Sequence, residues 1–185
     1  MQITNFVYNM VKISLLFKKV DRIFKIEFGH FKLSAISINK FKENKMEKLE
    51  AHKAAMKRFE TMINTADSKL AKELVADNAP FYTPASPESL YGGEGYLSVV
   101  HWMRRSFPDV QWKLEEMVAE GNIVAVRWTL TGTHNGTFMG IPATGKHISV
   151  SVMNFYYFND EGKITNDIAA EGMIGILRGI GALDK

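Results

Sequence analysis

The first half of the hydrophobic pattern is helical. Within 47–64, apolar residues return every three or four positions, which is the stripe of an amphipathic helix. Asp67 is a good N-cap for a shorter second helix that ends before Asn78. A third apolar stripe follows the glycines of 92–95 and stops at Pro108, whose ring cannot continue a helix. The pattern therefore predicts a helical hairpin followed by a third helix.

Beyond this point the hydrophobic period changes to two, which predicts strands. Alternating segments cover 110–118 and 124–131, a run rich in β-branched and aromatic residues covers 147–158, and a last strand runs from 163 to about 170. In the first strand, Val110, Trp112, Leu114 and Val118 are predicted to share one face. Helices followed by antiparallel strands indicate an α+β fold, with the helices packed on one face of the sheet.

Charge divides the 185-residue chain into two parts. Residues 1–45 contain nine Lys or Arg against three acidic residues, whereas residues 46–185 contain fourteen against seventeen. We expect 1–45 to be a basic extension, either disordered or placed ahead of a true start at Met46, and 46–185 to be one domain that folds alone. The domain itself is slightly acidic and carries no nucleic-acid-binding motif, so nucleic acid is not an expected partner.

Composition excludes several further classes of function. The chain has no cysteine, which excludes disulfides and thiolate metal sites and suits a reducing cytoplasm. Charged residues interrupt every apolar run before it reaches the roughly 20 residues of a membrane span. No phosphate loop, zinc spacing, dinucleotide fingerprint or serine elbow occurs. The expected location is cytoplasmic, and any chemistry must come from scattered polar groups.

The most interesting of these groups are two carboxylates near the end of the chain. Asp167 and Glu171 are predicted to share one strand face with Ala169, while Ile164 and Ile168 take the other. Spacing alone favours a solvated strand edge for this pair. His134 lies in a glycine-rich loop between two strands, where function and turn structure are equally good explanations.

One segment carries a family resemblance. Residues 132–146 read GTHNGTFMGIPATGK and resemble the loop of SnoaL-like polyketide cyclases, which typically reads G-T-H-x-G-x-F-x-G-I-P-P-T-G-K. The tail fits as well, with DEGKI at 160–164 and GILRGIG at 175–181. The resemblance covers nearly all of 46–183. It implies the cone-shaped fold of the nuclear-transport-factor-like superfamily: a strongly curved antiparallel sheet around one apolar ligand cavity, often in a dimer joined through the sheets, with no metal and no organic cofactor.

The resemblance also implies catalytic positions, and here the chain departs from the family. Characterised cyclases of this group use an Asp on the last strand for acid/base chemistry in an aldol ring closure, assisted by a His on the preceding strand. The gap-free match puts Ala169 at the Asp position and Asn154 at the His position. Because Ala169 should then face the cavity, strand alternation brings Asp167 and Glu171 to the same side. The predicted ligand-binding residues are His134, Tyr82, Tyr91, Trp128 and Tyr156.

Three functions stay open from the sequence. The first is a cofactor-free cyclase, isomerase or hydrolase, in which Asp167 or Glu171 moves a proton next to a carbonyl and Asn154 or a tyrosine stabilises the enolate. The second is a binding protein that keeps the pocket for a small, oxygenated apolar compound but has lost the chemistry. The third is a protein-interaction module with an exposed apolar sheet face.

Overall fold

The computed structural model describes residues 35–83, 86–170 and 172–183. The chain forms two units, Met1–Asn44 and Lys45–Lys185, and the second contains all strands of the described residues. The extension expected over 1–45 lies mostly outside the described residues. Its last part belongs to helix α2 (Ala35–Thr65), which begins twelve residues before the predicted start at 47. The predicted beginning of this helix is therefore wrong, because helical structure does not require the apolar stripe that marks the later turns.

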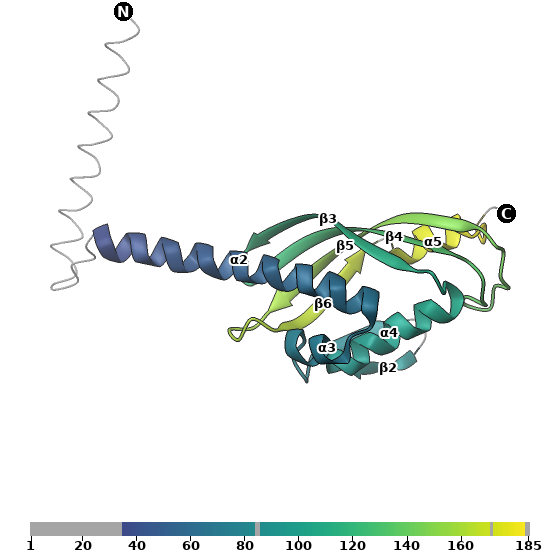
Figure 1. The fold of residues 1–185 in the computed structure, drawn as a ribbon, viewed down its shortest axis with the longest axis horizontal. Coiled ribbons are helices and arrows are strands. Elements are labelled where there is room, and N and C mark those ends of the chain that lie inside the picture. The colour runs from purple at the N-terminus through teal and green to yellow at the C-terminus, as the bar shows by residue number, and fades with distance from the viewer. Residues whose placement is uncertain (1–34, 84–85, 171, 184–185) are drawn as a thin grey trace, which may run out of the picture. The chain divides into compact units, whose positions relative to one another are not determined.

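Two further helices match the pattern. Helix α3 (Ser68–Leu74) begins at the predicted N-cap, where the Asp67 carboxylate accepts hydrogen bonds from the amides of Lys69 and Leu70 at 2.8 and 3.1 Å. Helix α4 (Gly92–Ser106) ends just before Pro108. It lies directly on α3, because a Cβ atom at Gly93 would come within 2.4 Å of the Ala71 backbone. This close approach holds α4 beneath the sheet (Figure 1).

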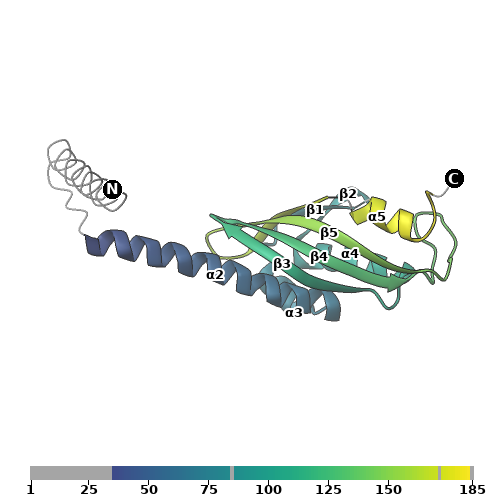
Figure 2. The same ribbon diagram turned by 90° about the horizontal axis from the view of Figure 1, so that it is seen from above.

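The four predicted strands are confirmed and form one antiparallel sheet. They are β3 (Gln111–Glu120), β4 (Ile123–Thr133), β5 (His147–Phe158) and β6 (Ile164–Ala170), paired in that order. Figures 1 and 2 show a curved sheet with α3 and α4 on one side of it. The fold class is therefore α+β, with helices packed on one face of a curved antiparallel sheet.

Three elements were not predicted. Strands β1 (Pro80–Thr83) and β2 (Ser86–Tyr91) pair as a small antiparallel sheet, in a stretch whose prolines indicate a loop. Helix α5 (Gly172–Gly179) is rich in glycine, which is a poor helix former. Packing explains it, because a Cβ atom at Gly175 would come within 2.4 Å of Val150 Cγ1 on β5. The glycines let α5 lie directly on the sheet.

A β-bulge overturns one predicted sheet face. The register of β3 against β4 shifts between Leu114 and Glu116, so one extra residue enters β3. Residues after the bulge turn over, Met117 and Ala119 pack against the core, and Val118 is 71% exposed. The prediction that Val118 lies inward with Leu114 is wrong for this reason.

A second irregularity changes β6. Phe158 pairs with Ile164, whereas Tyr157 pairs with Asn166, so Thr165 is an extra residue. Ile164 is consequently fully buried, on the same side as Asp167 rather than opposite to it. Beyond the irregularity the alternation is regular, with Ile168 54% exposed.

The inner face of the sheet packs against the helices in two adjoining clusters. In the first, Phe59 of α2 makes ring contacts with Trp128 and Tyr156 at centroid distances of 6.5 and 5.2 Å. The Asn64 side chain ties α2 to the edge of β3, since its amide donates to the Trp112 carbonyl at 2.7 Å and its oxygen accepts from the Trp112 amide at 2.9 Å. The second cluster lies between the end of α4, the 134–146 loop and α5.

In the part of the chain that the structure describes, no helix is long and apolar enough to cross a membrane.

Candidate functional site

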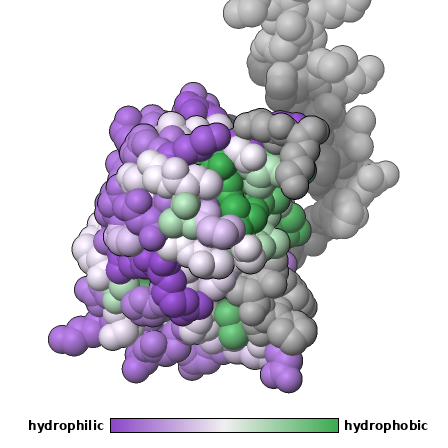
Figure 3. Space-filling model, turned by 90° about the vertical axis from the view of Figure 1, so that its right-hand side faces the viewer, coloured by the Kyte–Doolittle hydropathy of each residue, from purple (hydrophilic) through white to green (hydrophobic). Residues whose placement is uncertain are grey.

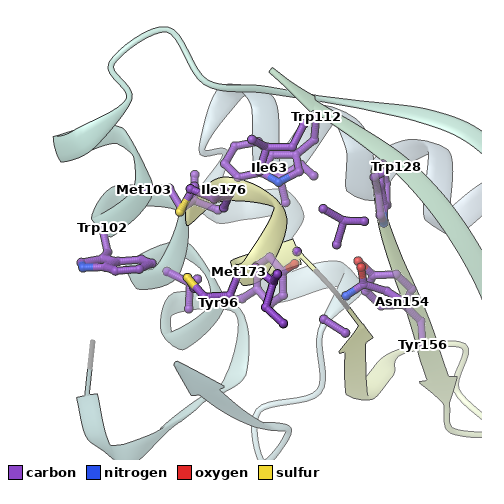
Figure 4. A pocket seen from close by; sticks show the side chains of 17 residues that line it. Ile63, Tyr96, Trp102, Met103, Trp112, Trp128, Asn154, Tyr156, Met173 and Ile176 are labelled. Atoms are coloured by element: carbon purple, nitrogen blue, oxygen red, sulfur yellow. The ribbon is translucent and has the colours of Figure 1, made fainter. Parts of the chain in front are cut away.

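A cavity of about 450 Å³ lies between the inner face of the sheet, α4 and α5 (Figure 4). That volume suits a drug-sized organic molecule. Strands β3 to β6 supply one wall, and the helices supply the other. The described lining residues are Ile63, Tyr96, Val99, Val100, Trp102, Met103, Trp112, Trp128, Leu130, Val152, Asn154, Tyr156, Ala169, Gly172, Met173, Ile174 and Ile176.

The two ends of the cavity differ in polarity. Figure 4 shows Trp128, Asn154 and Tyr156 together at one end, on the strands, whereas Trp102, Met103 and Ile176 lie at the other, on the helices. Ile174 of α5 lines the cavity and is 49% exposed, so the cavity wall reaches the surface at α5. Figure 3 views the molecule from the side of α5 and shows an apolar patch beside hydrophilic surface. The cavity therefore has a polar end on the strands and an apolar end on the helices.

The polar end contains both positions that the family resemblance singles out. Asn154 of β5 and Ala169 of β6 are direct cross-strand partners, and both line the cavity. The inward orientation predicted for Ala169 is thus confirmed. Asp167 pairs with Tyr156, and its Oδ2 accepts a hydrogen bond from Asn154 Nδ2 at 3.2 Å. Asp167 is not itself among the described lining residues; it lies next to Asn154 in the wall.

Burial dominates the electrostatics of Asp167. It raises the pKa of the carboxyl from its ordinary value of 3.8 to about 6, although the hydrogen bond from Asn154 favours the carboxylate and acts in the opposite direction. Near neutral pH such a group exists in both forms. This is the property that a general acid or base needs.

The phenol groups of Tyr96 and Tyr156 lie near this carboxyl. Burial raises the pKa of both Tyr96 and Tyr156, and the charge of Asp167 raises both further. The two phenols therefore stay protonated at neutral pH. The buried Nε1–H of Trp128 lies near the Tyr156 hydroxyl without the geometry of a full hydrogen bond, and no other acceptor faces it. The polar end thus offers several hydrogen-bond donors and one carboxyl group.

Among the predicted site residues, the structure brings Trp128, Asn154, Tyr156 and Asp167 together. Tyr91 stands apart, because it is 60% exposed and precedes α4 as its N-terminal cap residue. The side chain of Tyr82 and the whole of Glu171 lie outside the described residues. The prediction that Glu171 points into the pocket with Asp167 therefore stays a prediction.

His134 is fully buried, but it does not line the cavity. Its ring stacks on Phe107 at a centroid distance of 5.2 Å, and its Nδ1 accepts a hydrogen bond from the Thr144 amide at 3.3 Å. Burial lowers the pKa of His134, which keeps the imidazole neutral. Away from the cavity, the hydrogen bond between His134 and Thr144 joins the two ends of the 134–146 loop. Of the two explanations open from the sequence, its contacts favour turn structure.

Several lining residues were not predicted. Tyr96 and Met103 belong to the apolar stripe of α4, which predicts a helix but not a cavity, and Trp102 lies outside that stripe. Met173 and Ile174 come from α5, which the sequence did not reveal as a helix. One feature of the sequence could have marked Tyr96 as a site residue: it carries a hydroxyl group within an otherwise apolar helix face.

The described lining residues include no Lys, Arg or His. Across residues 35–83, 86–170 and 172–183, no group of three or more His, Asp or Glu side chains is arranged to hold a metal ion. What this arrangement can do is bind an uncharged, mostly apolar molecule and exchange a proton with it at the polar end.

Residues 53–180 match the family model described as SnoaL-like polyketide cyclase. The chain belongs to this family. The similarity spans α3, α4, α5 and strands β1 to β6, and so includes the whole described cavity. Among curated proteins, none is significantly similar to the chain.

Solved structures extend this result. TsrD from Streptomyces laurentii is 24% identical, with a TM-score of 0.63, and the match covers 72% of this chain and 97% of TsrD. IdmH from Streptomyces antibioticus, a proposed polyketide cyclase, is 25% identical with a TM-score of 0.60, covering 70% and 98%. A proposed polyketide cyclase from Bacillus cereus is also 25% identical, with a TM-score of 0.58, covering 71% and 80%. These likenesses support the same fold.

Proposed function

We propose that this SnoaL-like protein binds a small, uncharged, oxygenated apolar compound and catalyses cofactor-free proton transfer next to a carbonyl group, as a cyclase or isomerase. The observation that carries the proposal is the Asp167–Asn154 hydrogen bond at the polar end of an otherwise apolar cavity. A carboxyl group there can exchange protons near neutral pH, and the apolar walls exclude water from the reacting atoms.

In the proposed step, the Asp167 carboxylate removes a proton from the carbon next to the ligand carbonyl. The C–H bond breaks, its electron pair moves into the carbonyl to form an enolate, and the proton stays on Asp167. Asn154 or a tyrosine hydroxyl stabilises the enolate oxygen. In an isomerisation, Asp167 returns the proton to a different carbon of a conjugated enolate. In a ring closure, the enolate carbon forms a bond to a second carbonyl carbon of the same molecule, and the resulting alkoxide oxygen takes the proton from Asp167, which is thereby restored as a carboxylate.

The alanine at position 169 suits this use of Asp167. Asp167 and Ala169 lie on the same face of β6, and Ala169 lines the cavity with only a methyl group. A larger side chain there would stand between the cavity and the neighbouring carboxyl. We infer that a ligand occupies the space beside Ala169 and reaches Asp167 from there. The cyclase names of the relatives from S. antibioticus and B. cereus support the same class of reaction.

A second function is favoured by a different observation. The two family positions are occupied by Ala169 and Asn154, neither of which transfers protons at neutral pH, and Asp167 is not part of the cavity surface. The second function is therefore non-catalytic binding of the same class of compound. Binding alone needs neither proton-transferring residues at positions 154 and 169 nor a carboxyl group on the cavity surface.

We also propose that two copies of the chain associate through the outer faces of their sheets. A straight row of residues crosses all four strands there: Val118 pairs with Ala125, Ala125 with Phe155, and Phe155 with Ile168. Val118, Phe155 and Ile168 are all at least half exposed. An apolar row across a sheet suits the self-complementary contact of a symmetric dimer. A cytoplasmic location, expected from the cysteine-free composition, completes the proposal.

The experiment that tests the function uses a panel of small β-keto esters and cyclic enones, with binding and turnover measured in parallel. We expect the wild type to bind and convert some members, and Asp167→Asn to retain binding while turnover falls about a hundredfold or more. Binding without any turnover by the wild type would leave the non-catalytic function. Absence of both would contradict the pocket function altogether.

A further inference from the structure

This inference rests on the proposed function and concerns Tyr96 of α4, on the helical side of the cavity. We propose that the Tyr96 hydroxyl donates the hydrogen bond that holds the carbonyl oxygen of a bound ketone or ester, and that the use of this neutral donor in place of a cation makes the cavity select uncharged carbonyl compounds over carboxylates.

The Tyr96 ring is held in one orientation. Phe59 contacts it edge-on at a centroid distance of 4.9 Å and an interplanar angle of 69°, and Phe81 does the same at 5.0 Å and 87°. Phe59 and Phe81 are themselves buried. A tyrosine side chain has only two torsions, so a clamped ring fixes the position of its oxygen, and only the hydroxyl proton remains free to turn. The donor is therefore positioned before a ligand arrives.

Two other polar aromatic groups lie near this hydroxyl. Burial is the main reason that the pKa values of Tyr156 and Tyr96 are raised, and each of the two tyrosines also shifts the pKa of the other. The Nε1–H of Trp128 is buried without a hydrogen-bond partner. All three side chains line the cavity, so its polar end presents neutral donors.

The Tyr96 hydroxyl can turn its proton toward a bound molecule. Asp167 influences Tyr96 through its charge. Tyr96 lines the cavity, and the hydroxyl proton of a tyrosine rotates to suit its acceptor, so a ligand oxygen in the cavity can accept from it.

Charge decides which ligand oxygen fits. None of the described lining residues is Lys, Arg or His, so a carboxylate would lose its hydration without gaining a counter-ion. Above pH 6 it would also meet the negative charge of Asp167. A ketone or ester oxygen accepts from Tyr96 without either cost, which identifies uncharged carbonyl compounds as the ligand class.

The test compares three probes of similar shape: 2-acetylnaphthalene, the hydrocarbon 2-isopropenylnaphthalene, and 2-naphthoate. Tyr96→Phe removes the donor and keeps the ring, while Tyr157→Phe on the same strand as Tyr156, but on the opposite sheet face, is the control. Loss of one uncharged hydrogen bond should weaken binding of the ketone about three- to tenfold. Binding of the hydrocarbon should change less than about twofold, and the control should change neither.

A second measurement observes the hydrogen bond itself. The carbonyl stretching band of bound 13C=O-labelled 2-acetylnaphthalene should lie at lower frequency in the wild type than in an apolar solvent, and should return toward the solvent value in Tyr96→Phe. An unshifted band in the wild type would overturn the inference. So would equal weakening of ketone and hydrocarbon, or naphthoate binding as tight as ketone binding at pH 8.

These outcomes separate the two proposals. If the wild type binds ketone and hydrocarbon but Tyr96→Phe changes the binding of both by the same factor, the Tyr96 inference fails and the pocket function stands. If the wild type binds neither probe, the proposed function fails and the inference fails with it.

Discussion

Replacing Asp167 with asparagine removes an ionisable group that burial makes costly. The pKa of Asp167 is raised from 3.8 to about 6. A shift of about two pKa units corresponds to roughly 3 kcal/mol between the protonated and charged forms. Because the folded state holds this proton more tightly than the unfolded state, the favourable contribution is complete below about pH 4 and is lost as the pH rises through about 6.

Asp167→Asn should therefore be more stable than the wild type at pH 8, by up to about 3 kcal/mol, with little difference at pH 4. The measurement is urea unfolding of both proteins at pH 4, 6 and 8. Asp160→Asn is the matched control: Asp160 is exposed, and its hydrogen bond with Lys48 lowers its pKa, so this variant should gain no stability at pH 8. A wild type that equals or exceeds Asp167→Asn in stability at pH 8 would refute the reasoning.

Three other variants test separate parts of the structure. Ala169→Asp restores the family acid beside Asn154 and should create or raise cyclase-type turnover of β-keto esters; unchanged turnover, with folding intact, would show that the remaining pocket does not suit that chemistry. Phe155→Glu should convert the proposed dimer to a monomer in sedimentation at micromolar concentration, and a wild type already monomeric there would contradict the proposed interface. Gly175→Ala should lower the unfolding free energy by about 1–3 kcal/mol, since its Cβ would come within 2.4 Å of Val150 Cγ1, and unaltered thermal unfolding would contradict that packing.

Much of the fold could be predicted from periodicity because the longer elements are amphipathic. Each of the four sheet strands has alternating or β-prone residues, and Asp67 and Pro108 mark helix ends by local chemistry. The errors occur where one extra residue enters a strand. Val118 and Ile164 each lie on the face opposite to the predicted one, and nothing in the local sequence distinguishes such a bulge from a regular strand. Helix α5 depends on contacts with β5 that are distant in sequence.

The candidate site was predictable where two strands share a register. One gap-free register of the family match assigns both Asn154 and Ala169, and they are direct partners in the cavity wall. Tyr96 was missed because an apolar stripe does not tell which hydroxyl meets a cavity. His134 was proposed from its loop motif, but its contact with Phe107 comes from the end of a distant helix. The local sequence pattern thus identifies which residues pair across strands better than it identifies which side chains lie between the sheet and the helices.

The central claim is that Asp167 exchanges protons with a carbonyl compound held in the cavity, and deuterium exchange measures this step directly. 2-Acetylnaphthalene is incubated with the protein in D2O at pD 7, and NMR follows loss of the protons next to its carbonyl. We predict that the wild type accelerates this exchange well above buffer, with a rate that rises through about pH 6, and that Asp167→Asn lowers it about a hundredfold. Equal rates in wild type, Asp167→Asn and buffer, under conditions where the ketone is bound, would contradict the account.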